Sequence, residues 1–247
     1  MKSKSILKTV VLSMLIAIGV VISPILRVEG MCPMAHFINI VCSVFMGPWY
    51  SLLCAFIIGI IRMTIMGIPP LALTGAIFGA FLSGVFYRFS KGKLIFAVLG
   101  EIIGTGIIGA IVSYPVMSLI WGKDGISLFF YVPSFICGTL IGGSIAFFFL
   151  RKYADTGMLT KTQDMLGSKV YADKSTILSN TILIATFGAI LFFVFFMVPQ
   201  VFKVEGAVWG YLAYGSIAIF LALALIYFAV KKIKGKNDQR DSSRIEK

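Results

Sequence analysis

The chain has 247 residues, of which 59% are hydrophobic and only 13% are charged, and its mean hydropathy is +0.98. Soluble domains carry roughly 25% charged residues, so this composition excludes an ordinary water-soluble globule and predicts an integral membrane protein. The net charge of +12 does not indicate nucleic-acid binding, because the basic residues collect in short runs between apolar segments, where they orient membrane helices.

Apolar segments predict an all-α protein of about eight helices. They cover residues 6–24, 34–46, 49–66, 71–89, 94–121, 129–150, 177–198 and 207–230. The first run is too long for a signal peptide and lacks an A-x-A cleavage site, so we expect it to remain as a helix. The second is shorter than the roughly 20 residues that a spanning helix needs. It either crosses the membrane incompletely or forms a re-entrant hairpin with the third.

The basic residues predict the orientation. Eighteen of the 22 lie in segments that are cytoplasmic when both termini are inside, whereas Arg27, Lys123 and Lys203 lie outside and Arg62 lies within an apolar span. This bias follows the positive-inside rule for an N-in, C-in protein of the plasma membrane.

The same pattern predicts four parts along the chain. Residues 1–152 form a six-helix membrane domain, and residues 153–176 form a polar cytoplasmic linker. Residues 177–230 form a two-helix transmembrane hairpin, and the basic cytoplasmic tail, residues 231–247, is expected to be disordered.

The motifs of several enzyme classes are absent from the sequence. It contains no G-x-x-x-x-G-K-[ST] phosphate loop, so the chain does not hydrolyse ATP itself, and no H-E-x-x-H or G-x-S-x-G motif. The four cysteines form no C-x-x-C pair and predict neither a disulfide framework nor a metal site. We therefore do not expect an enzyme.

Two ionisable residues lie inside apolar spans. Arg62 and Glu101 would each cost about 2.5–3.5 kcal/mol at the centre of a lipid-facing helix, so both should face the protein interior. Their functional interpretation is a solute pocket open to the outside. The alternatives are an Arg62 that snorkels to the interface and a protonated Glu101 that holds helices together. Their depths differ by about 10 Å by helix rise, so the sequence does not predict a direct ion pair.

His36 and Asn39 stand three residues apart, on one face of the second predicted helix. An imidazole and a carboxamide both donate and accept hydrogen bonds, which suits a neutral or weakly polar heterocycle. The alternative is a capping or interface pair. The remaining pocket candidates lie beside prolines at the predicted outer helix ends, where aromatic residues also form ordinary membrane belts. They are Thr74, Tyr114, Tyr131 and Ser134.

Small residues recur every four positions on the first predicted helix, at Thr9, Ser13 and Ala17. Such spacing lets two helices approach closely. The stripe either packs within the chain or docks a partner membrane protein.

Several motifs in one order give residues 6–152 a resemblance to the ThiW family. They are PILRVEG at 24–30, PMAHFIN at 33–39, GPWY at 47–50, GIIR at 59–62, LTGA at 73–76, GEIIGTG at 100–106, SYPV at 113–116 and YVPSF at 131–135.

The resemblance implies a substrate-binding S component of an energy-coupling factor (ECF) importer, with the thiamine precursor hydroxyethylthiazole as solute. It implies a transmembrane coupling subunit and two cytoplasmic ATPases as partners, so that ATP is used by the partners and no cofactor is bound directly. The coupling subunit would dock at Ser13-x-x-x-Ala17. The resemblance implies a fold of six membrane helices, and the last two predicted helices lie beyond it. Open alternatives are another thiamine-related solute, a stand-alone secondary carrier, and a membrane-embedded enzyme or assembly factor.

Overall fold

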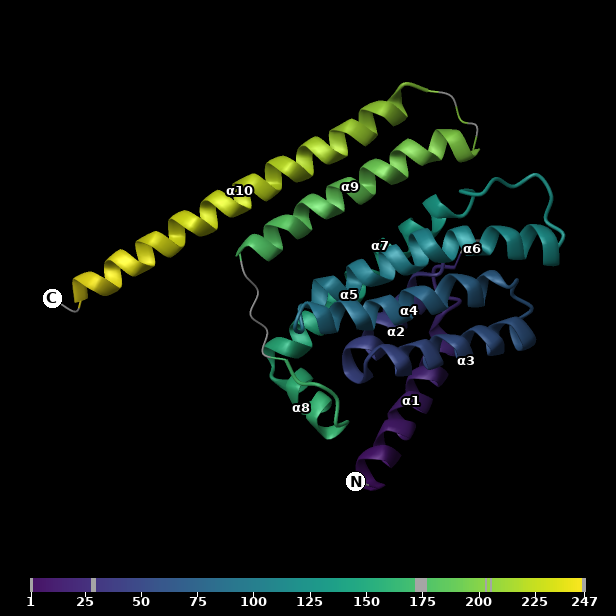
Figure 1. The fold of residues 1–247 in the computed structure, drawn as a ribbon, viewed down its shortest axis with the longest axis horizontal. Helices are drawn as coiled ribbons and strands as arrows, with labels where there is room; N and C mark the ends of the chain where they lie inside the picture. The colour runs from purple at the N-terminus through teal and green to yellow at the C-terminus, as the bar shows by residue number, and fades with distance from the viewer. Residues whose placement is uncertain (1, 28–29, 172–176, 203, 205, 246–247) are drawn as a thin grey trace. The chain divides into compact units, whose positions relative to one another are not determined.

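The computed structural model describes residues 2–27, 30–171, 177–202, 204 and 206–245, and these residues contain helices and no strands (Figure 1). They divide into two compact units, residues 1–173 and 174–247. The helices of the first unit are α1 (Lys2–Ile22), α2 (Pro33–Met46), α3 (Pro48–Met66), α4 (Leu71–Phe89), α5 (Leu94–Glu101), η1 (Ile102–Gly109), α6 (Ala110–Pro115), η2 (Val116–Ile120), α7 (Val132–Asp155) and α8 (Met158–Met165).

Six of the described helical stretches are long and apolar enough to cross a membrane. They are residues 4–22, 48–66, 71–89, 94–120, 132–155 and 208–234. Helix α2 and the apolar part of α9 (residues 184–196) fall short of that length. The all-helical, multi-pass architecture is thereby confirmed, whereas the number of eight spanning helices stays a prediction.

Helix α4 lies at the centre of the first unit, in contact with α2, α3, α5 and η1. Glycines make this packing close. A Cβ atom added to Gly104 would lie 2.6 Å from the Cα atom of Gly79, and one added to Gly100 would lie 2.4 Å from the carbonyl oxygen of Leu82. These distances fix the face of α5 and η1 that meets α4, and Glu101 and Thr105 lie in this interface.

The predicted helix 94–121 is one continuous helical path with two π-helical stretches, η1 and η2. The first begins directly after Glu101, and the second begins after Pro115, which has no N–H to donate to the preceding turn. Wide turns of this kind re-aim the side chains around them and are frequent at functional sites.

The expected linker contains a packed helix. The side chain of Gln163 on α8 is fully buried, and its Nε2 donates to the carbonyl oxygen of Val44 at 2.8 Å and to the hydroxyl of Tyr87 at 3.0 Å. Leu159 and Leu166 are buried beside it. Residues 158–165 are therefore part of the first unit, because one side of this polar segment is apolar.

The second unit is a pair of contacting helices, α9 (Ile177–Phe202) and α10 (Val208–Ile245). Asn180 Nδ2 donates to the hydroxyl of Tyr227 at 2.9 Å, and a Cβ atom on Gly188 would meet the side chain of Phe220. In the structure residues 231–245 continue α10, whereas the composition of this tail predicts disorder, which stays a prediction. Lys, Arg and Gln are good helix formers, so the polar composition that suggested disorder is equally compatible with an extended helix.

Candidate functional site

A cavity of about 480 Å³ lies in the first unit, at the end where α2, α4 and α7 begin and α3 finishes. This volume falls within the range of small-molecule sites. The residues that line it are Pro24, Arg27, Gly30, Met31, Cys32, Ala35, His36, Arg62, Ile68, Pro69, Leu71, Ala72, Gly75, Ala76, Thr105 and Phe135.

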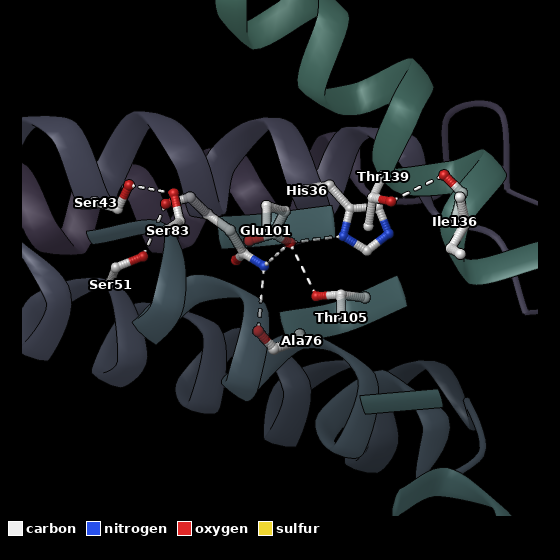
Figure 2. Close-up of polar contacts among 10 residues, drawn as sticks. His36, Ser43, Ser51, Ala76, Ser83, Glu101, Thr105, Ile136 and Thr139 are labelled. Carbon is white, nitrogen blue, oxygen red and sulfur yellow. Dashed lines mark hydrogen bonds and ion pairs between the residues drawn. The ribbon is translucent and has the colours of Figure 1, made fainter. Parts of the chain in front are cut away.

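Beside the cavity, one carboxylate oxygen of Glu101 contacts three polar side chains (Figure 2). Glu101 Oε1 lies 2.9 Å from His36 Nδ1, accepts a hydrogen bond from Asn39 Nδ2 at 2.9 Å, and accepts another from Thr105 Oγ1 at 3.1 Å. Asn39 Nδ2 also reaches the carbonyl oxygen of Ala76 at 3.4 Å. The network therefore joins α2, α4, α5 and η1.

The network follows from local helix geometry. His36 and Asn39 lie one turn apart on α2, and Glu101 and Thr105 lie one turn apart across the junction of α5 and η1. Gly79 on α4 provides the space, because a Cβ atom there would lie 2.0 Å from Thr105 Oγ1 and 2.8 Å from Glu101 Oε2. Two polar pairs on different helices thus meet where a third helix has no side chain.

The electrostatics of the network depend on burial. Glu101 is fully buried, so its charge must be balanced by hydrogen bonds and by its neighbours. His36 is the one titratable partner of Glu101 among the described residues, and the two form an ion pair when the imidazole is protonated. In a neutral ring, an Nδ1–H that donates to Glu101 leaves Nε2 as an acceptor. Since His36 and Thr105 line the cavity, Glu101 orients groups that a solute would touch.

Arg62 lines the same cavity from the last turns of α3 and is only 3% exposed. Its Nε has no hydrogen-bond partner among the described residues. The Cys32 side chain lies beside the guanidinium, but a thiol is only a weak partner. Arg62 forms no ion pair with Glu101, which contacts His36 instead.

The other predicted site residues lie outside the lining. Thr74 shares a 2.6 Å hydrogen bond with Ser113, and Tyr114 is half-buried. Tyr131 is buried, with its ring 5.8 Å from that of Phe135, which does line the cavity. The Ser134 hydroxyl oxygen lies close to Gly30, at 2.7 Å from the position that a Cβ atom on Gly30 would take.

The stripe on α1 lies on the surface of the first unit. Thr9, Ser13 and Ala17 are all exposed, together with apolar neighbours such as Val10 and Met14. Within this unit the stripe therefore does not serve to pack α1 against another helix.

Sequence reasoning did not identify Thr105 and Arg27 as cavity residues. Thr105 carries a usable signal, because it follows the intramembrane Glu101 by four residues and so shares its helix face. Arg27 was counted only as an outer charge, although it lines the cavity from the connection between α1 and α2. Among the described residues, no group of three or more His, Cys, Asp or Glu side chains lies together as a metal site would require.

A protein-family model described as thiamine-precursor transporter protein (ThiW) matches residues 9–156. The match includes every cavity-lining residue and the whole Glu101 network. No curated protein and no solved structure matches the chain.

Proposed function

The chain belongs to the ThiW family of thiamine-precursor transporter proteins, and we propose that it is the substrate-binding S component of an ECF-type importer for the thiazole precursor of thiamine. As a member of this family it is a multi-pass membrane transporter protein. The identity of the solute and the mode of energy coupling are the proposed parts.

The observation that carries the proposal is the cavity beside the Glu101 network. Its wall is mostly apolar, with Phe135 among the lining residues, and its polar groups are few and convergent. Hydroxyethylthiazole has one small aromatic ring and one short alcohol side chain. His36 and Thr105 offer hydrogen bonds to its heteroatoms, while the apolar wall suits its ring and methyl group.

The proposed energy source lies in partner subunits. The sequence has no phosphate loop, so ATP would be hydrolysed by two cytoplasmic ATPases that act through a transmembrane coupling subunit. The exposed small-residue stripe at Thr9, Ser13 and Ala17 is the proposed docking face for that subunit. The distribution of basic residues supports an N-in, C-in arrangement in the plasma membrane, which faces the cavity outward.

Binding of hydroxyethylthiazole by the purified chain in detergent, measured by isothermal titration calorimetry, tests the ligand. We expect saturable binding with one site per chain, and thiamine and its pyrimidine precursor as competitors to rank lower. No saturable binding of the thiazole would overturn the assignment.

A stand-alone secondary carrier is the second candidate, and the His36–Glu101 pair favours it. Buried His and carboxylate side chains inside membrane proteins often relay protons. Liposomes that contain only this chain distinguish the two mechanisms. Uptake driven by a proton gradient without ATPase subunits supports the carrier, whereas uptake that requires the coupling subunit, the ATPases and ATP supports the S component.

A further inference from the structure

Among the described residues, the buried cation of Arg62 in the cavity has no ion-pair partner. The Arg62 side chain is 3% exposed, and the ion pairs formed between described residues join Lys4 to Asp164, His36 to Glu101 and Arg151 to Asp155. A guanidinium is charged under all physiological conditions and carries five N–H donors in a planar fork. A buried charge of this kind is stable only when an anion or several acceptors face it.

The buried carboxylate of Glu101 already has partners and forms no ion pair with Arg62. Its Oε1 lies within hydrogen-bond distance of the His36, Asn39 and Thr105 side chains, and Glu101 itself does not line the cavity. Among the described residues that line the cavity there is no Asp or Glu, and Glu29, between the lining residues Arg27 and Gly30, lies outside the described residues. The charged groups that the described residues place in its wall are two guanidinium groups, the buried Arg62 and the exposed Arg27.

Helix ends add to this positive potential. Cys32 and Ala35 line the cavity from the start of α2, and Leu71 and Ala72 line it from the start of α4. The N-terminus of a helix carries a partial positive charge and favours anions. Two such ends and two guanidinium groups thus surround one space.

We propose that the cavity recognises an anionic substituent, a carboxylate or a phosphate monoester, which Arg62 binds with its fork while Arg27 and the starts of α2 and α4 complement the charge. This inference rests on the proposed thiazole site and specifies which form of the precursor the site prefers. The heterocycle lies at the His36 and Thr105 side, and the anionic substituent lies at Arg62.

The test compares four ligands by calorimetry on the full-length protein: hydroxyethylthiazole, its phosphate monoester, the corresponding thiazole acetic acid, and the neutral amide of that acid. We expect at least one anion to bind about tenfold or more tightly than the alcohol and the amide, as a charge-assisted bidentate contact provides. The anion that binds more tightly identifies the preferred substituent. The amide has the shape of the carboxylate without its charge, so it separates the effect of charge from that of shape.

Two variants assign the preference to Arg62. In Arg62→Gln the affinity for the anion should exceed that for the alcohol by about threefold or less. In Arg62→Lys, which keeps the charge without the planar fork, this affinity ratio should be intermediate. Lys152→Gln, an exposed basic residue near the end of α7, is the matched control and should keep the full preference.

Wild-type protein alone decides the inference, whatever the folding of the variants. If the alcohol binds and neither anion binds more tightly, the anion inference is overturned and the proposed function stands. If none of the four binds, both are overturned. An anion preference that survives in Arg62→Gln would overturn the role of Arg62.

Discussion

His36 Nδ1 and Glu101 Oε1 lie 2.9 Å apart, although 65 residues separate them in the chain. The contact connects α2 with α5, and through Asn39 and Thr105 it also connects α4 and η1. The network around this buried carboxylate thereby joins α2, α4, α5 and η1, four of the elements around the cavity.

Replacement of Glu101 by Ala should destabilise the protein strongly. The imidazole of His36 and the hydroxyl of Thr105 would lose this acceptor in a buried site, and Asn39 Nδ2 would keep only its 3.4 Å contact with Ala76, at a total cost of about 3 kcal/mol or more. Thermal unfolding in detergent measures the effect. Asp155→Ala removes the carboxylate of an exposed pair with Arg151 and should cost at most about 1 kcal/mol. Equal losses in the two variants would contradict the structural role of the network.

Thr105 and Thr74 provide a matched pair that separates binding from stability. Each forms a buried or half-buried hydrogen bond through its hydroxyl, to Glu101 and to Ser113 respectively. Thr105→Val and Thr74→Val should each lose about 1 kcal/mol of stability. Only Thr105 lines the cavity, so we expect its variant to bind the thiazole about five- to tenfold more weakly. Calorimetry that shows the same affinity loss for Thr74→Val would place Thr74 in the site after all.

Gly79→Ala should disturb the network without removing any of its members. The new Cβ atom would lie 2.0 Å from Thr105 Oγ1, so α4 must move away from η1 or the hydroxyl must leave Glu101. We expect lower thermal stability and weaker ligand binding. Gly215→Ala on α10 is the control, because no atom lies within 4 Å of its added Cβ. An unchanged Gly79→Ala protein would show that the two helices are less closely packed than described.

Hydropathy predicted the helices of this fold because the length of an apolar run depends only on local sequence. It also identified His36, Asn39, Arg62 and Glu101 as the unusual polar residues, since a charge or amide inside an apolar span is costly wherever it occurs. Their partners were not predictable in the same way. The depth argument compared Glu101 with Arg62 alone, and the contact with His36 depends on how α2 and α5 pack against α4.

The π-helical stretch after Glu101 was also not predicted from the sequence. A regular 3.6-residue period is assumed when residues are assigned to a helix face, and η1 departs from that period from Ile102 to Gly109. The helices within the polar linker and the tail were not predicted, for a different reason. Composition does not reveal that Gln163 finds two buried partners, or that residues 231–245 continue a helix.

Truncation after residue 173 tests whether the second unit contributes to the site. Every cavity residue and the whole Glu101 network lie in the first unit, which has its own compact set of contacts. We therefore expect the shortened protein to bind the thiazole with an affinity within about twofold of the full chain. Size-exclusion chromatography should first confirm that it remains monodisperse. A loss of binding in a monodisperse protein would assign α9 and α10 a part in the site.

Ser13→Leu and Ser144→Leu test the proposed docking face on α1. Both serines are exposed on long apolar helices, but only Ser13 belongs to the small-residue stripe with Thr9 and Ala17. A leucine in the stripe keeps a partner helix at a distance, because close approach requires small side chains. Ser13→Leu should therefore bind the thiazole normally, yet lose co-purification with the coupling subunit and ATP-dependent uptake in proteoliposomes. Ser144→Leu should retain both. Normal uptake by Ser13→Leu would exclude this face as the contact, and uptake lost equally in both variants would show a general effect of leucine at exposed positions.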